Sequence, residues 1–98
     1  MKYQLVVHPK AEADLRHTFE WYEEQEKGLG GEFLRCVDAA ISHINRSPKM
    51  FFLIYKGVRR SLIRRFPYGI FYILEENRIV VLAVLHVRQH PIRWQKRK

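Results

Sequence analysis

The residues of this chain whose types and spacing best suit chemistry are arginines and histidines of its C-terminal half. They gather on two predicted strands: Arg59, Arg60, Arg64, Arg65, His86 and Arg88. Guanidinium groups bind phosphates through paired N–H donors and stabilise negative charge that develops there. A histidine such as His86, or a tyrosine such as Tyr72, can move the proton of a ribose 2′-hydroxyl. The pattern therefore indicates phosphate recognition or metal-independent RNA cleavage.

The same residues also have a structural interpretation. Arginines on an edge strand cover the sheet edge and deter aggregation, and His86 can be a hydrogen-bonded residue at a strand end. For any single residue the structural interpretation is favoured. For the cluster as a whole, the two interpretations stand about equal.

Several other chemistries do not fit the sequence. The only cysteine, Cys36, excludes an internal disulfide and a cysteine-based zinc site. His86 and His90 have helical metal-ligand spacing on a segment that is not helical, so we expect no metal site. The glycines between residues 28 and 31 lie between two predicted helices and lack the Lys-Ser/Thr pair of a phosphate loop. No cofactor is expected.

Charge is unevenly placed along the chain. The 98 residues carry a net charge of +8, with residues 56–98 at +9 and residues 1–26 at −3. Such a field speeds encounters with polyanions or with an acidic protein. A solvated basic face would also keep the protein soluble, but solubility does not require the charge to be segregated. We therefore favour a polyanionic or acidic partner.

Two helical patterns follow a first predicted strand at Tyr3–Val7. The first begins after His8 with Pro9 in its first turn, and the glycines at 28–31 are expected to separate it from the second. The second ends before Ser47-Pro48, because the residue before proline avoids the helical region. Each has apolar residues on one face: Ala11, Leu15, Phe19 and Tyr22, then Phe33, Val37, Ala40, Ile41 and Ile44.

The strand-like segments Val58–Phe66, Ile70–Glu75 and Ile79–Val87 predict an antiparallel three-strand meander, with the last strand central because it is apolar throughout. Alternation along Val58–Phe66 places Arg60 and Arg64 on one face and the other two arginines on the opposite face. The segment Met50–Tyr55 has no clear pattern, and the tail from His90 is expected to form a short helical turn or to be flexible. We predict an α+β fold of order β-α-α-β-β-β, in one domain spanning residues 1–98.

No apolar run approaches the roughly 20 residues that a membrane-spanning helix requires. Residues 1–10 also lack the apolar core of a signal peptide. A soluble cytoplasmic protein with no membrane partner is expected.

Three stretches of the sequence resemble toxins of the RelE/ParE superfamily. They are PKAEADL at residues 9–15, VRRSLIRRFPYGIFY at 58–72 and VLAVLHVRQHP at 81–91. The resemblance covers nearly the whole chain in order, and the family's β-α-α-β-β-β core agrees with the pattern above. It implies a growth-inhibiting toxin of a bacterial type II toxin–antitoxin module, of the kind also described as plasmid stabilisation proteins. Such a toxin is held inactive by an acidic, partly disordered antitoxin.

Members of the superfamily divide by target. RelE-like members cut mRNA on the ribosome, whereas ParE-like members are described as poisoning DNA gyrase without RNA cleavage. Arg60 and Arg64 match basic positions of the nucleases, but Leu62 stands where some nucleases have a second lysine, and Gly69 stands where many have an arginine. His86 matches a histidine common in ParE-like sequences and also resembles the strand-end histidine of some ribonuclease members. These departures favour a ParE-like gyrase inhibitor, with a RelE-like ribosome-dependent endonuclease as the alternative and an adaptor that binds only its antitoxin as a third.

The resemblance and the residue types together define two sets of expected site residues. If the chain is a ribonuclease, the expected catalytic residues are Arg60, Arg64, His86 and Arg88. The expected binding residues are Arg59, Arg65, Tyr72, His90, Arg93 and Trp94. The antitoxin is expected to lie across the basic sheet and against the helical hairpin near Trp21.

Overall fold

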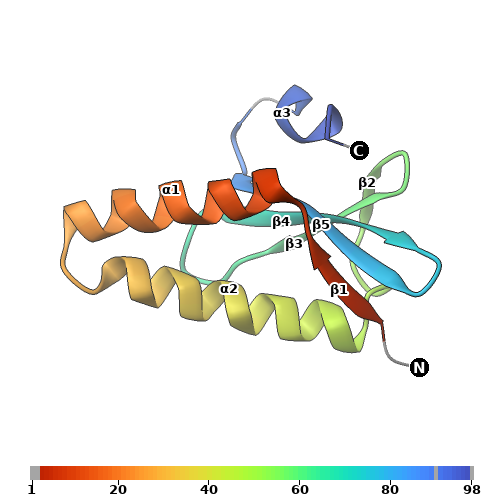
Figure 1. Ribbon diagram of the computed structural model, residues 1–98, viewed down its shortest axis with the longest axis horizontal. Coiled ribbons are helices and arrows are strands. Elements are labelled where there is room, and N and C mark those ends of the chain that lie inside the picture. Colours follow the sequence, from red (N-terminus) through yellow and green to blue (C-terminus); the bar gives the residue numbers. More distant parts are fainter. Residues whose placement is uncertain (1–2, 90, 98) are drawn as a thin grey trace.

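In the computed structural model, which describes residues 3–89 and 91–97, a helical hairpin packs on a twisted sheet (Figure 1). The elements in chain order are β1 (Gln4–Val7), α1 (Pro9–Gln25), α2 (Leu29–Arg46), β2 (Leu53–Tyr55), β3 (Val58–Leu62), β4 (Tyr68–Glu75), β5 (Arg78–His86) and α3 (Ile92–Gln95). The predicted α+β order is confirmed, with one addition: the segment without a clear pattern supplies the short strand β2. The C-terminal tail contains a short helical turn, α3, which is one of its two expected forms.

The sheet has the strand order β1-β5-β4-β3-β2. Strands β2 to β5 are antiparallel neighbours, whereas β1 pairs in parallel with β5, from Gln4 opposite Arg78 to Val7 opposite Val81. The sheet is therefore mixed, and the predicted meander forms most of it. The prediction that the last strand is central is confirmed, because β5 lies between β1 and β4 and is buried from Val81 to Leu85.

The two long helices are joined more tightly than the glycine pattern predicted. Gly30 and Gly31 lie inside α2, so the break between helices is confined to the residues just before Leu29. A Cβ on residue 30 would lie 2.6 Å from the Phe19 carbonyl oxygen, so glycine is needed where α2 crosses α1. The Glu23 carboxylate of α1 accepts the Gly28 and Gly30 N–H groups at 2.9 and 3.0 Å and thereby caps α2.

The predicted strand Val58–Phe66 ends early, at Leu62. Ile63 still bonds to Tyr68 through its N–H, but the chain then turns, and Arg65 has a left-handed φ of 71°. The alternation that we extended through Arg64 and Arg65 therefore stops at Leu62. Conversely, β4 begins two residues earlier than predicted, at Tyr68.

Apolar side chains cover both faces of the sheet. On the helix face the core includes Phe33, Ile44, Ile70 and Tyr72. On the other face Trp94 of α3 stacks on Phe71, with ring centroids 4.9 Å apart and an interplanar angle of 20°. The sheet thus has a thick apolar layer under the hairpin and a thin one under α3.

Beyond Val81, where β1 ends, the edge of β5 is completed by side chains instead of a strand. The Asp14 carboxylate accepts the Val84 N–H at 3.0 Å, and Arg97 donates to the Leu82 carbonyl at 3.2 Å. Asp14 and Arg97 also form an ion pair with each other. The pair therefore satisfies backbone groups that would otherwise be buried without partners.

Candidate functional site

The predicted catalytic residues do not converge in this structure. The aliphatic stem of Arg60 lies on the α3 face, with Cγ 3.1 Å from the place where a Cβ on residue 69 would be. The His86 ring lies on the helix face, 5.4 Å from the Tyr68 ring. Because Tyr68 and Gly69 are consecutive strand residues, their side chains point to opposite faces. The sheet therefore separates Arg60 from His86.

The remaining predicted catalytic residues lie at other positions. Arg64 is exposed in the loop after β3, beside α2. Arg88 is exposed in the turn after β5, and its N–H donates to His86 Nδ1 at 3.1 Å. The backbone of Arg88 thus contacts His86, whereas Arg60 lies on the other face of the sheet and Arg64 lies beside α2.

Two predicted binding residues hold the link between α2 and β2. The Arg59 guanidinium donates to the carbonyls of Lys49 and Phe51 at 3.1 and 2.7 Å. Tyr72 is fully buried, and its hydroxyl donates to the Pro48 carbonyl at 2.7 Å. Burial raises the pKa of Tyr72 to about 12, against a smaller opposing effect of Arg59. Both side chains therefore have a structural role, because they hold the backbone of the α2–β2 link.

The other predicted binding residues are divided between surface and interior. Trp94 is buried between Phe71 and Tyr55. Arg93, its neighbour in α3, is exposed. Arg65 is also exposed and pairs with Glu32 of α2 at 3.5 Å. His90 lies outside the described residues.

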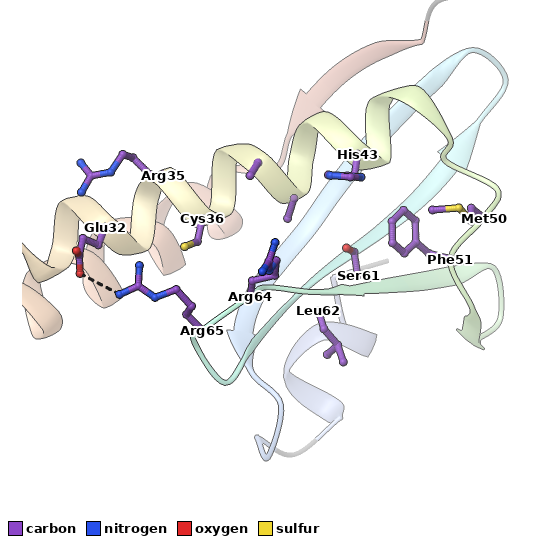
Figure 2. A pocket seen from close by; sticks show the side chains of 12 residues that line it. Glu32, Arg35, Cys36, His43, Met50, Phe51, Ser61, Leu62, Arg64 and Arg65 are labelled. Atoms are coloured by element: carbon purple, nitrogen blue, oxygen red, sulfur yellow. Dashed lines mark ion pairs between the residues drawn. The ribbon is translucent and has the colours of Figure 1, made fainter.

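A cavity with a volume of about 580 Å³ lies between α2 and the end of β3 (Figure 2). We call it the α2–β3 groove. Its apolar lining comes from Cys36, Ala39, Ala40, Met50, Phe51 and Leu62. Its polar rim comes from Glu32, Arg35, His43, Ser61, Arg64 and Arg65. An apolar floor under a mainly basic rim suits an apolar group that carries negative charge beside it.

A second feature is an aromatic corner where α1 ends near the β3–β4 loop. Trp21 is about half exposed, and Tyr22 contacts Tyr68, with ring centroids 6.1 Å apart. Burial raises the pKa of Tyr22, and the Tyr68 hydroxyl, which shares a hydrogen bond with it, raises that pKa further. With His86 and Pro67 these residues line a small surface hollow. Trp21 is therefore accessible, as the sequence-based antitoxin placement requires.

Sequence reasoning missed the α2–β3 groove. Two of the predicted arginines, Arg64 and Arg65, lie on its rim, but Arg35, His43 and the apolar floor were not singled out. The floor combines the outward edge of an amphipathic helix with Met50 and Phe51, whose segment has no periodic pattern. The one signal in the sequence was the run of apolar residues from Met50 to Ile54.

No described helix is both long and apolar enough to cross a lipid bilayer. Among the described residues, no group of three histidine, cysteine, aspartate or glutamate side chains is arranged to hold a metal ion.

Comparison with solved structures shows that the fold is a known one. A chain of the structure titled "Chromosomal ParDE TA system from P. aeruginosa" superposes with a TM-score of 0.79 and 16% sequence identity. The match covers 89% of this chain and 98% of that one. The two chains therefore share a fold, a helical hairpin packed on a mixed sheet.

Sequence comparison gives the family. The family model for the ParE toxin of type II toxin–antitoxin systems, parDE, matches residues 5–91. Toxin ParE2 of Mycobacterium tuberculosis, from strains CDC 1551 / Oshkosh and ATCC 25618 / H37Rv, is 29% identical over 92 residues. The match covers 93% of this chain and 88% of each relative. The chain therefore belongs to the ParE toxin family of type II toxin–antitoxin systems.

Proposed function

We propose that this ParE-family chain arrests growth by binding DNA gyrase, and that an acidic antitoxin holds it inactive. The observation that supports the choice of target is that the sheet separates Arg60 from His86, while Arg88, the predicted cation beside His86, meets it through its backbone N–H. An RNA-cleaving site needs a proton-transferring group and a phosphate-stabilising cation at the same scissile bond. A binding toxin has no such requirement, because its cations need only match a partner's surface.

Gly69 supports the same choice. Gly69 stands where the resemblance to nucleases implies an arginine. In this structure the Arg60 stem lies across it, and both Cγ and Cδ of Arg60 lie within 3.2 Å of the place that a Cβ on residue 69 would occupy. A longer side chain at residue 69 would displace Arg60, so this chain uses the position to pack one arginine and not to supply a second.

The charge distribution supports the acidic antitoxin. The net charge of +9 on residues 56–98 covers the loop after β3 and the C-terminal segment. A disordered acidic segment would gain both encounter rate and affinity from such a surface. Because gyrase and an antitoxin both work in the cytoplasm, we place the chain there.

The proposal is tested by inducing this chain alone in a bacterial host and following mRNA 5′ ends and the DNA-damage response in the same culture. We expect growth arrest, a DNA-damage response and intact mRNA. Purified chain should also inhibit supercoiling by purified gyrase. New ribosome-dependent mRNA ends would overturn the proposal in favour of the RelE-like endonuclease, and unchanged growth would leave only an antitoxin-binding adaptor.

A further inference from the structure

Acidic and basic side chains occupy different layers of this fold. Eight of the ten aspartate and glutamate residues lie between residues 9 and 46, in the helical hairpin, and the other two are Glu75 and Glu76 at the β4–β5 turn. Residues 47–74 and 77–98 contain no carboxylate side chain. One hairpin carboxylate, Asp14, reaches the edge of β5, where Arg97 neutralises it. The face of the sheet under α3 is therefore surrounded by cations alone, except at the β4–β5 turn.

Arg60 lies on this face, next to α3. On β3 it pairs with Phe71 of β4, whose ring stacks on Trp94 of α3. The Arg60 stem lies across Gly69, with Cγ and Cδ 3.1 and 3.2 Å from the place that a Cβ would occupy there. Its guanidinium forms no hydrogen bond or ion pair with the described residues. Because packing fixes the stem and the charge has no partner, this guanidinium can bind an anion at a low cost in side-chain entropy.

The helical turn α3 adds two further cations. Arg93 and Lys96 are exposed and three positions apart, so they lie on the same side of the turn. Neither side chain forms a hydrogen bond or ion pair with another described residue. The buried Trp94 and the ion pair of Arg97 hold the turn against the sheet. The three residues Arg60, Arg93 and Lys96, which we call the α3-face cations, are therefore carried by well-anchored backbone.

Three unpartnered cations on a face without nearby carboxylates suit a polyanion with regularly spaced charges. The phosphates of duplex DNA form such a polyanion, and their contacts with arginine and lysine release counterions. The two rings under α3, Phe71 and Trp94, are buried and stacked on each other. They are therefore not available to stack on unpaired bases, as proteins that bind single strands require. The face thus suits the backbone of a duplex better than a single strand.

We infer that the α3-face cations bind the phosphate backbone of duplex DNA, so that the chain contacts the DNA that gyrase holds as well as gyrase itself. This inference rests on the proposed function, because gyrase acts on bound duplex DNA. Contacts to phosphates carry no sequence information, so binding is independent of base sequence. Three phosphate contacts give a slope of about −2.7 for the logarithm of the binding constant against the logarithm of the salt concentration.

The test measures the binding of purified chain to a fluorescein-labelled DNA duplex of about 20 base pairs, by fluorescence anisotropy at several salt concentrations. The double variant Arg60→Met/Arg93→Gln removes two α3-face cations, and methionine keeps the stem that packs on Gly69. The control Lys27→Gln/Arg46→Gln removes the same net charge from exposed positions of the hairpin. A single-stranded RNA of the same length is the second ligand, and circular dichroism checks that both variants are folded.

We expect the wild-type chain to lose about 40-fold in affinity for the duplex between 50 and 200 mM salt. Arg60→Met/Arg93→Gln should weaken binding at 50 mM salt about 10-fold or more and reduce the salt slope by about 2, whereas the hairpin control should change affinity less than about 2-fold. Equal losses in the two double variants would show that net charge alone attracts the DNA, and would overturn the inference. Tighter binding to the RNA, or no binding of the duplex at about 100 μM chain in 50 mM salt, would overturn it as well.

Inhibition of gyrase supercoiling is measured separately with the wild-type chain. A chain that binds the duplex through the α3-face cations without inhibiting gyrase fails the proposed function alone. A chain that inhibits gyrase but binds the duplex equally well in both double variants fails this inference alone.

Discussion

Asp14 and Arg97 lie 83 positions apart in the chain and form an ion pair whose side chains are 7% and 8% exposed. The pair joins the first turns of α1 to the C-terminal segment, and both side chains also bond to the edge of β5. A buried charge that loses its partner is costly, because its desolvation is no longer offset. The ion pair therefore fixes the C-terminal segment, and with it α3, against α1 and β5.

Arg97→Ala is expected to destabilise the fold by about 3 kcal/mol, because it leaves the Asp14 carboxylate buried beside Val84 without a cation. Urea unfolding measures the loss. Lys96→Ala is the control, since it removes an exposed charge from the neighbouring position. Equal stability of the two variants would show that the pair contributes little.

Gly30→Ala and Gly31→Ala form a matched pair inside α2. The first is expected to destabilise the fold by about 1–3 kcal/mol, because the new Cβ meets the Phe19 backbone oxygen at 2.6 Å. The second is expected to stabilise it by up to about 1 kcal/mol, because the new Cβ would meet only the flexible end of Arg35, at 3.7 Å, and alanine favours helix. Thermal unfolding of both variants measures this difference in stability. Equal stability of the two variants would show that α1 and α2 are not in close contact at Gly30.

Much of the fold was predictable from the sequence, because its long elements carry strong periodic signals. The apolar faces of α1 and α2 and the unbroken apolar run of β5 identify those elements without tertiary information. β2 has three residues and a register shift against β3, too short for a period to be read. The close approach at Gly30 depends on how α2 crosses α1, and one sequence does not contain that geometry.

The candidate site was less predictable than the fold. Arg64 and Arg65 were singled out, but alternation put them on opposite faces of a strand that in fact ends at Leu62. Arg59 has the same residue type as its neighbour Arg60, yet only the Arg59 side chain donates hydrogen bonds to the α2–β2 link. Residue type alone cannot distinguish an arginine that holds the backbone from one that faces a partner.

Arg59→Met and Arg60→Met are expected to separate these two roles. Arg59→Met should cost about 1.5–3 kcal/mol of stability, because two carbonyls lose a charged donor. Arg60→Met should cost less than about 0.5 kcal/mol, since its stem packing on Gly69 is retained. Denaturant unfolding gives both values. A larger loss of stability in Arg60→Met would contradict this prediction, because it would show that the Arg60 guanidinium also stabilises the fold.

Tyr72→Phe is expected to change how stability depends on pH. Burial raises the pKa of Tyr72 from its usual 10.0 to about 12, so the folded chain keeps a proton that the unfolded chain releases. The stabilisation is present in full below about pH 10 and is lost as the pH rises towards 12. The phenylalanine variant should be less stable by about 1–2 kcal/mol at neutral pH, because Pro48 loses its donor. Wild type should lose this advantage between about pH 10 and 12, and a constant difference across that range would contradict the assignment.

The parallel pairing of β1 with β5 has a consequence for synthesis on the ribosome. β1 is synthesised first, but its partner strand β5 is synthesised late. The Asp14 carboxylate likewise cannot accept its hydrogen bond until Val84, 70 positions further on, has been made. Contacts this distant in sequence form slowly and only once both segments are free of the ribosome. A nascent or truncated chain that stops before β5 cannot complete the sheet. The polypeptide therefore cannot reach its folded, active form until nearly all of it has left the ribosome.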